Sequence, residues 1–207
     1  MEEVSVSKVI RSVNYDQKEI IEDIMKLNGI DRFDADLTYG NGVFWKDLPR
    51  PFFCFDIDES LDGVVHASST NLPVLDNSFK SVMFDPPFLT YVRENRSGNG
   101  EMIMAKRFAG YWTYNELEDH YRNTIIEAHR VLNHKGLLVF KCQDIIHNHK
   151  LHCTHMNVVN WSEGLFRLKD LFILPAKHRL PSPNRAGTQK HARIFHSYFL
   201  VLEANKK

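Results

Sequence analysis

Residues 79–88 read FKSVMFDPPF, a mostly apolar run followed by an acid, two prolines and an aromatic ring. The apolar run predicts a buried strand. The prolines predict that this strand ends in a rigid turn, because each ring fixes one backbone torsion. In such a turn the carboxylate of Asp85 and the carbonyl of Pro86 can accept both hydrogens of an exocyclic amine, while Phe88 stacks on the attached ring. The stretch predicts a site for a planar molecule with an amino group, and a stiff turn without chemistry is the alternative.

A glycine loop precedes this stretch in the chain. Residues 36–42 read DLTYGNG and follow an expected strand at 33–37. Gly40 and Gly42 let the backbone pass close to a ligand, although loops also use glycine for other reasons. The loop lacks the small residue that a dinucleotide fingerprint would place at Trp45, and it lacks the Gly-Lys-Ser/Thr of a phosphate loop. A cofactor other than a dinucleotide or a nucleoside triphosphate is therefore expected.

Two acids follow the second expected strand, at 51–55. Asp56 can accept hydrogen bonds from both hydroxyls of a ribose. Asp58 is the alternative, since a small error in register exchanges the two. Both acids can instead simply begin a helix.

Helical and strand-like segments alternate along the chain. Expected helices span 17–27, 114–132 and 157–165, and expected strands span 33–37, 51–55, 64–67, 81–84, 137–142, 171–174 and 195–203. Such alternation argues for a parallel α/β sheet with helices on both faces. A chain of 207 residues suits one domain with a full core, so residues 1–207 are expected to form a single domain.

These stretches together resemble the class I S-adenosylmethionine-dependent methyltransferases that carry a (Asp/Asn/Ser)-Pro-Pro-(Tyr/Phe/Trp) motif and methylate amino groups. Residues 36–42 resemble the family's cofactor loop, residues 55–58 its acidic motif and residues 129–136 the turn before its fifth strand, in the family's order. Residues 196–202 resemble the last strand of DNA amino-methyltransferases. The whole pattern is similar to small stand-alone enzymes of phages and prophages. Without room for a large target-recognition domain, we expect the chain to bind with little sequence preference, to dimerise or to borrow specificity from a partner.

The resemblance implies a Rossmann-like fold with a seven-stranded, mostly parallel sheet, an antiparallel last strand and S-adenosyl-L-methionine as cofactor. It implies a catalytic group of Asp85, Pro86, Pro87 and Phe88, and a cofactor-binding group of Asp36, Thr38, Gly40, Gly42, Asp56, Asp58 and Ser68. Asp36 would place negative charge near the ammonium and sulfonium groups of the cofactor. Ser68 departs from the family, which commonly has an acid there that meets the adenine amine.

Candidate target-binding residues are Tyr91, Gln143, Lys177, Arg179, Arg185, Lys190 and Arg193. The cations lie in a basic loop at 175–194, which is longer than an ordinary hairpin needs. Cations on one loop can neutralise phosphates locally, and a solvated loop is the alternative. Tyr91 adjoins a segment at 92–112 that is expected to be a mobile loop. Gln143 follows the strand at 137–142, at the sheet edge where open α/β sheets bind ligands.

The histidines at 147, 149, 152 and 155, together with Cys153, form a dense cluster in the sequence. An irregular loop can converge such side chains on zinc. Methyl transfer needs no metal, however, and the chain has no matching Cys-x-x-Cys. A polar or target-binding segment without a metal is therefore expected.

Composition limits the partners. Lys and Arg number 26, as do Asp and Glu, so any nucleic acid must bind to a local patch rather than to an overall basic protein. Cys54, Cys142 and Cys153 lack paired spacing and predict buried thiols in a reducing cytosol. With no signal-like start and no membrane-length apolar run, a cytoplasmic protein without a membrane partner is expected. Oligomeric state is left open.

The expected function is methyl transfer from S-adenosylmethionine to an exocyclic amino group of a nucleic-acid base, with adenine N6 or cytosine N4 of DNA as the preferred target. The sequence leaves RNA, a protein amide or a small heteroaromatic amine as alternative substrates. A nucleic-acid-binding module that has lost catalysis is the non-enzymatic alternative, and the serine at position 68 is its support.

Overall fold

A computed structural model describes residues 9–90, 111, 113–177 and 190–206. Its frame is a seven-stranded sheet in the order β3-β2-β1-β4-β5-β9-β8. The strands are β1 (Ala35–Asp36), β2 (Phe53–Asp56), β3 (Val65–His66), β4 (Phe79–Phe84), β5 (Leu132–Cys142), β8 (Phe166–Pro175) and β9 (His196–Ala204). Neighbouring strands in the part β3-β2-β1-β4-β5 of this order pair in parallel, whereas β9 is antiparallel to β5 and β8. The predicted mostly parallel α/β sheet with an antiparallel last strand is confirmed.

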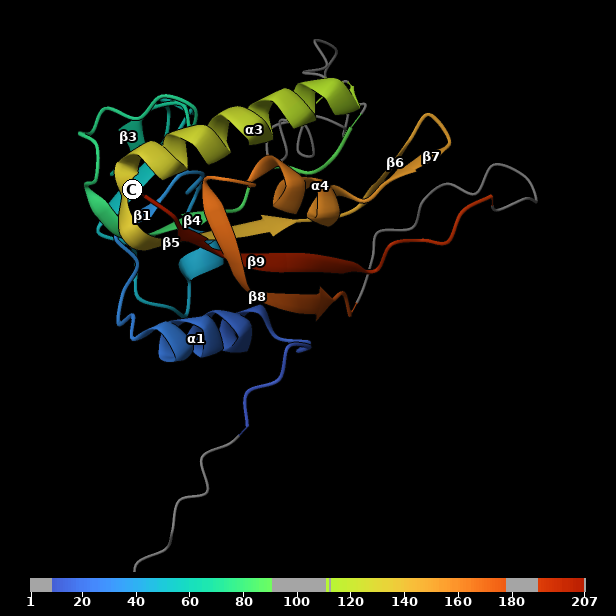
Figure 1. Ribbon diagram of the computed structural model, residues 1–207, viewed down its shortest axis with the longest axis horizontal. Coiled ribbons are helices and arrows are strands. Elements are labelled where there is room, and N and C mark those ends of the chain that lie inside the picture. The colour runs from blue at the N-terminus through green and yellow to red at the C-terminus, as the bar shows by residue number, and fades with distance from the viewer. Residues whose placement is uncertain (1–8, 91–110, 112, 178–189, 207) are drawn as a thin grey trace, which may run out of the picture.

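Helices cover both faces of this sheet, as predicted. Helix α1 (Gln17–Asn28) lies on one face, and α3 (Tyr114–Val131) and α4 (Thr154–Trp161) lie on the other (Figure 1). Asp16 caps α1 by accepting a hydrogen bond from the backbone N–H of Lys18 at 2.8 Å, and Gly29 ends it with φ of 62°. Thr113 caps α3 through the N–H of Glu116 at 3.2 Å. Local capping signals therefore place both of these helices.

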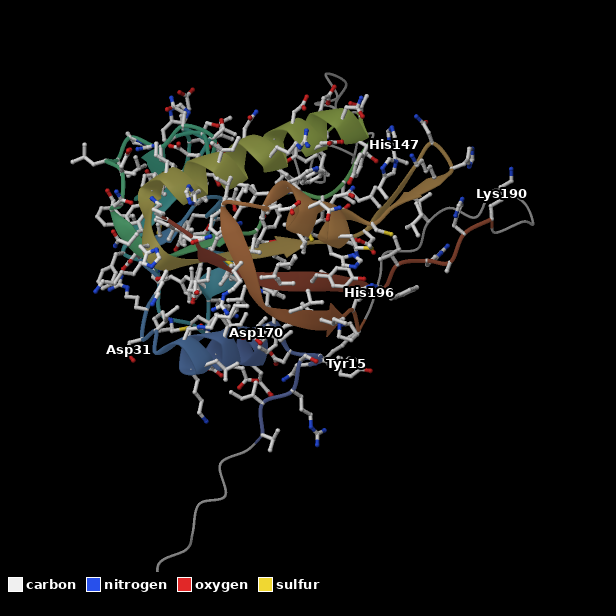
Figure 2. All side chains as sticks on the ribbon, in the orientation of Figure 1. Tyr15, Asp31, His147, Asp170, Lys190 and His196 are labelled. Carbon is white, nitrogen blue, oxygen red and sulfur yellow. The ribbon has the colours of Figure 1, made fainter. Side chains whose placement is uncertain are left out.

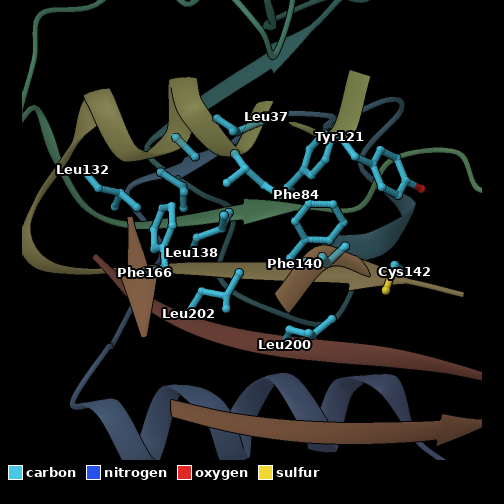
Figure 3. Close-up of a cluster of buried hydrophobic side chains, with 14 of the residues drawn as sticks. Leu37, Phe84, Tyr121, Leu132, Leu138, Phe140, Cys142, Phe166, Leu200 and Leu202 are labelled. Atoms are coloured by element: carbon cyan, nitrogen blue, oxygen red, sulfur yellow. The ribbon is translucent and has the colours of Figure 1, made fainter. Parts of the chain in front are cut away.

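Side chains of the central strands alternate between two cores, one on each face. Leu138, Phe140, Leu200 and Leu202 pack with α3 in the core that Figure 3 shows. Their neighbours in the sequence, among them Val139 and Val201, pack with α1 on the opposite face. This alternation follows from the two-residue period of a strand. It fixes the register of β5 against β9 and, through β5, the position of β4.

In the carboxyl-terminal third, two expected elements are wrong in position and one element was not expected. The helix expected at 157–165 is α4, and it begins three residues earlier. Strand β8 begins at Phe166 rather than at 171. Residues of the histidine cluster form an unexpected hairpin of β6 (Ile145–His147) and β7 (Lys150–His152). For α4, a contact with a preceding element helps to place the start of the helix. The N–H of His155 near the start of α4 donates to Asp144 at 3.3 Å, a cap supplied by the end of β5.

Two expected loops fall largely outside the described residues. Of the segment 92–112, only Tyr111 is described, and of the basic loop 175–194 the two ends are described. Cys54 and Cys142 are buried free thiols, and Cys153 is a partly buried one. Within the described ranges, no helix combines the length and the apolar composition that crossing a bilayer requires.

Candidate active site

The sequence-predicted acids come together at the carboxyl ends of β1, β2 and β4. Asp36 pairs in register with Cys54 of β2 and with Met83 of β4, so the chain leaves all three strands at one edge. Asp56 ends β2, and Asp85 directly follows β4. In open α/β sheets ligands bind at this edge. The fold thus brings the predicted catalytic turn beside the predicted cofactor loop.

A direct hydrogen bond joins the catalytic turn to the cofactor loop. The backbone N–H of Asp85 donates to the hydroxyl of Thr38 at 3.0 Å. One step back along the same strands, the N–H of Leu37 donates to the carbonyl of Met83 at 2.9 Å. Any shift of the loop after β1 is therefore transmitted to the position of Asp85.

The carboxylate of Asp85 is held by a lysine from β5. Nζ of Lys141 donates to Oδ2 of Asp85 at 3.1 Å and to Oε1 of Gln17 at 2.9 Å. The two charged side chains are only 12% and 21% exposed. Rings of Phe44 and Phe199 flank the ammonium group, at 5.3 and 5.6 Å. An ion pair that is shielded in this way is screened less by salt than a surface pair.

The rest of the turn is fixed by packing. Pro86 is buried, and the hydroxyl of Tyr121 in α3 donates to the carbonyl of Pro87 at 3.0 Å. Phe88 is partly buried and packs against the α3 core. The turn therefore has the rigidity that its two prolines predict.

Both predicted loop glycines have positive φ, 56° at Gly40 and 74° at Gly42. A Cβ on Gly42 would lie 2.6 Å from the hydroxyl of Tyr39, so a larger residue would displace the Tyr39 ring and would be strained at this φ. A Cβ on Gly40 would meet nothing within 4 Å, which means that open space adjoins the backbone at this point. The N–H of Gly40 donates to Oδ2 of Asp56 at 2.7 Å. The second-strand acid thus holds the glycine loop and borders the open space.

Asp36 is buried beneath the loop, with 1% exposure. It accepts hydrogen bonds from the indole of Trp45 at 2.6 Å and from the N–H of Thr38 at 2.8 Å. Burial raises the pKa of Asp36 to about 7, and the charges of Asp85 and Asp56 act in the same direction, while its two hydrogen bonds oppose the shift. The structure therefore gives Asp36 an anchoring role inside the loop.

Asp58 and Ser68 lie at the margin of the site. Asp58 is exposed and accepts hydrogen bonds from the N–H of Ser60 at 2.9 Å and from its hydroxyl at 2.6 Å, so it closes a turn after β2. Ser68, after β3, shares a hydrogen bond of 2.8 Å with the hydroxyl of Thr70. Of the two acids, Asp56 is the one bonded to the glycine loop.

The structure adds a buried polar network that the sequence did not reveal. His120 of α3 hydrogen-bonds to the hydroxyl of Ser69 at 2.8 Å through Nε2 and to the hydroxyl of Tyr111 through Nδ1. Burial lowers the pKa of His120 to about 4, so the ring is neutral at pH 7. The N–H of Tyr111 donates to the carbonyl of Leu89 at 3.1 Å. The network therefore ties the chain just after Phe88 to α3.

The residues after β5 mainly form structural contacts. Gln143 is 8% exposed, and its amide donates to the carbonyl of His196 at 2.8 Å. Asp144 accepts from Nδ1 of His155 at 2.7 Å and from the hydroxyl of Tyr198 at 3.3 Å. These bonds join the end of β5 to α4 and to the start of β9. The predicted target contact of Gln143 remains a prediction.

The described part of the predicted basic loop lies beyond the carboxyl edge of the sheet. Lys177, Lys190 and Arg193 are exposed there, and Figure 2 shows Lys190 at the end of the molecule opposite Asp31. Tyr91, Arg179 and Arg185 lie outside the described residues. In the described ranges no three histidine, cysteine or acidic side chains are grouped as metal ligands.

Several solved structures with the same fold are described as methyltransferases. An N-methyltransferase, NodS from Bradyrhizobium japonicum WM9, superposes with a TM-score of 0.54 at 10% identity, over 92% of this chain and 94% of that one. TrmN from Thermus thermophilus superposes with a TM-score of 0.52 at 12% identity, over 88% of this chain. This chain spans about half of that protein, 47%.

A SAM-dependent methyltransferase from Methanosarcina mazei gives a TM-score of 0.50 at 9% identity, over 89% of this chain and 98% of that one. At such identities the likeness establishes the Rossmann-like methyltransferase fold. No family model matches the sequence, and no curated protein matches it either.

Proposed function

We propose that this chain is an S-adenosylmethionine-dependent methyltransferase that acts on an exocyclic amino group of a nucleic-acid base, with adenine N6 or cytosine N4 of DNA as its target. The observation that carries the proposal is the connection of two predicted motifs at one sheet edge. The N–H of Asp85 bonds to Thr38 of the glycine loop at 3.0 Å, and Asp56 bonds to Gly40 of the same loop at 2.7 Å.

The residues at this edge suit the proposed cofactor. S-adenosyl-L-methionine supplies an electrophilic methyl group on a sulfonium. Carboxylates near the loop favour a ligand with positive sulfonium and ammonium groups. The open space beside Gly40 adjoins Asp56, whose oxygens keep lone pairs for ribose hydroxyls. A neutral or anionic ligand would gain less from this set of acids.

Asp85 and the Pro86 carbonyl then act on the target amine. Such an amine is a poor nucleophile because its lone pair is delocalised into the ring. Its two hydrogens donate to the carboxylate and the carbonyl, which stabilise the positive charge that develops on nitrogen as the N–CH₃ bond forms and the S–CH₃ bond breaks. The extra proton leaves the nitrogen afterwards. Phe88 stacks on the base and keeps the amine in line with the methyl group.

Lys141 contributes by orienting Asp85. It occupies Oδ2, while Gln17 fixes the ammonium group from the other side. The remaining oxygen of Asp85 is then available to the amine in one defined orientation. Preorganised groups of this kind cost no rearrangement at the moment of reaction.

The assay for this proposal follows the transferred methyl group. Purified protein is incubated with radiolabelled S-adenosylmethionine and duplex DNA, single-stranded DNA, total RNA or a protein extract, and labelled nucleic acid is digested for nucleoside mass analysis. The proposal predicts label in N6-methyladenine or N4-methylcytosine from DNA. Label that appears only in protein or in a small molecule would show that the substrate is not a nucleic acid. Calorimetry that detects no cofactor binding would contradict the proposal that the chain is an enzyme.

A further inference from the structure

The β6–β7 hairpin leaves the sheet at the same edge as the catalytic turn. Phe84, the last residue before Asp85, pairs with Phe140 of β5, and the hairpin begins shortly after β5 ends at Cys142. Cys142 in turn pairs with Tyr198 near the start of β9. Figure 1 shows the hairpin extending past the sheet on the side from which the chain enters β9. The hairpin is therefore placed to contact a substrate that reaches the catalytic turn.

The hairpin and the segment that leads into β9 touch one another. Nε2 of His191 lies 2.9 Å from the carbonyl oxygen of His149, in the turn of the hairpin, and donates a hydrogen bond to it. At the base of the segment, the N–H of Ala176 donates to the carbonyl of Phe195 at 2.6 Å. Two segments about forty residues apart in the chain thus form one continuous surface, joined near the hairpin tip and anchored on the β8–β9 pair.

This surface is uniformly basic in its described part. We call it the hairpin–arm surface, and it consists of His149, Lys150, Lys177, Lys190, His191 and Arg193. All six side chains are exposed except that of His191, which is partly exposed. Residues 145–153, 176–177 and 190–195 contain no aspartate or glutamate, although the whole chain has as many acids as bases. The surface therefore carries four formal positive charges, and no acid in these segments offsets them.

The four strong cations also lack internal partners within the described part of the chain. No carboxylate of that part forms an ion pair with Lys150, Lys177, Lys190 or Arg193. Lysines and arginines elsewhere behave differently, since Arg130, Arg167 and Lys141 each pair with an acid. A group of unpaired cations on one surface is suited to a polyanion outside the protein.

We propose that the hairpin–arm surface binds the sugar–phosphate backbone of the strand whose base enters the catalytic turn. This inference rests on the proposed function and adds the β6–β7 hairpin to the substrate-binding part of the protein. Lysine and arginine at this spacing neutralise phosphates and release condensed counterions, so binding depends strongly on salt and little on sequence. Such contacts position the strand and leave base selection to the catalytic turn.

The test reverses two charges on the surface. The double variant Lys150→Glu/Lys190→Glu is compared with Lys26→Glu/Lys80→Glu, which makes the same change in net charge. Lys26 is exposed in the last turn of α1, and Lys80 is exposed near the start of β4, at the opposite edge of the sheet. Fluorescence anisotropy with labelled single-stranded and duplex oligonucleotides gives the dissociation constant at several salt concentrations, and calorimetry gives the cofactor affinity.

The surface variant is expected to bind nucleic acid at least tenfold more weakly than the control, with the slope of log K against log salt reduced by about 1.4 to 1.8. Its cofactor affinity is expected to stay unchanged, and KM for nucleic acid should rise more than kcat falls. Equal affinity of the two variants, or wild-type protein that binds an acidic protein instead of nucleic acid, overturns the inference. If the surface variant binds nucleic acid more weakly than the control while the wild-type protein methylates no base, the surface is upheld and the proposed function is refuted.

Discussion

Asp36 is a buried acid whose ionisation is linked to folding. Its pKa in the folded protein is raised to about 7 from 3.8, mainly by burial. Between pH 3.8 and about 7, the folded protein therefore holds a proton on Asp36 that the unfolded chain has lost. The contribution of Asp36 to stability is therefore fully present below about pH 4 and is lost as pH rises to 7, by up to about 1.4 kcal/mol per pH unit.

Asp36→Asn removes this dependence, because an amide does not titrate. The free energy of unfolding by urea is measured for both proteins at pH 5, 6, 7 and 8. The value for the variant minus the value for wild type should increase up to pH 7 and stay constant above it. A difference between the two proteins that is independent of pH would show that Asp36 is ionised throughout. It would then contradict the buried, protonated state.

Lys141 should influence the chemical step more than cofactor binding. Lys141→Met leaves Oδ2 of Asp85 without its donor, and losing a charged hydrogen bond of this kind costs about 1.5–3 kcal/mol. We expect kcat to fall by about 10- to 100-fold while the dissociation constant of the cofactor changes less than about twofold. Lys141→Arg, which keeps the charge, should recover part of the loss. Equal losses in kcat and cofactor affinity would indicate a merely structural role.

Substitution of Gly40 separates the effect of backbone strain on stability from the effect of a blocked cofactor site on binding. Gly40→Ala introduces a Cβ into the open space beside the loop at a φ of 56°. Gly164→Ala is a matched control, because Gly164 also has positive φ, 80°, and nothing within 4 Å of its Cβ position. Both changes should cost about 1–2 kcal/mol of stability. In calorimetry, Gly40→Ala alone should weaken cofactor binding, and equal binding by both variants would place the cofactor elsewhere.

At the scale of elements, residues with local signals were predictable and residues with distant partners were not. Helix α1 and helix α3 have side-chain caps in their own sequence, at Asp16 and Thr113. Helix α4 has no such side-chain cap, and Asp144 from the end of β5 supplies one. Pattern reasoning therefore misplaced α4, because the deciding contact is eleven residues away.

The β6–β7 hairpin escaped prediction for a different, local reason. Its turn residues, Asn148 and His149, have φ values of 50° and 58°. Tight hairpins favour this conformation at both central positions, and Asn-Gly is its usual sequence signal. A histidine at the second position hides that signal, particularly inside a run of histidines that suggests metal binding.

Asp144 should be worth more to stability than a local cap. Asp144→Ala removes bonds to His155 and Tyr198 at once, in a nearly buried position. We expect a loss of about 2–3 kcal/mol in the free energy of unfolding, against about 1 kcal/mol for Asp16→Ala at the start of α1. Chemical denaturation with circular dichroism measures both. Equal losses would mean that the link between β5, α4 and β9 adds nothing beyond ordinary capping.

At the scale of the whole molecule, parallel strands place the site. Asp36, Asp56 and Asp85 are distant in the chain, and the family resemblance implied a shared site for them. The structure brings them together because parallel strands end at a common edge. What the sequence did not provide were the contacts that side chains of other elements make at this edge. Lys141 comes from β5, Gln17 from α1 and His120 from α3, and their contacts with the site depend on packing across the sheet.

The central claim is that Asp85 performs chemistry at this edge rather than holding the cofactor. The most direct measurement is the single-turnover rate of methyl transfer to DNA by wild-type protein, Asp85→Ala and the control Asp31→Ala, with cofactor affinity from calorimetry on the same samples. Asp31 is exposed and precedes the start of β1, whereas the site lies at the carboxyl ends of the strands. Figure 2 shows it at the end of the molecule opposite Lys190. We predict that Asp85→Ala transfers methyl about 100-fold or more slowly at nearly unchanged cofactor affinity. Transfer by Asp85→Ala at the wild-type rate would contradict the account.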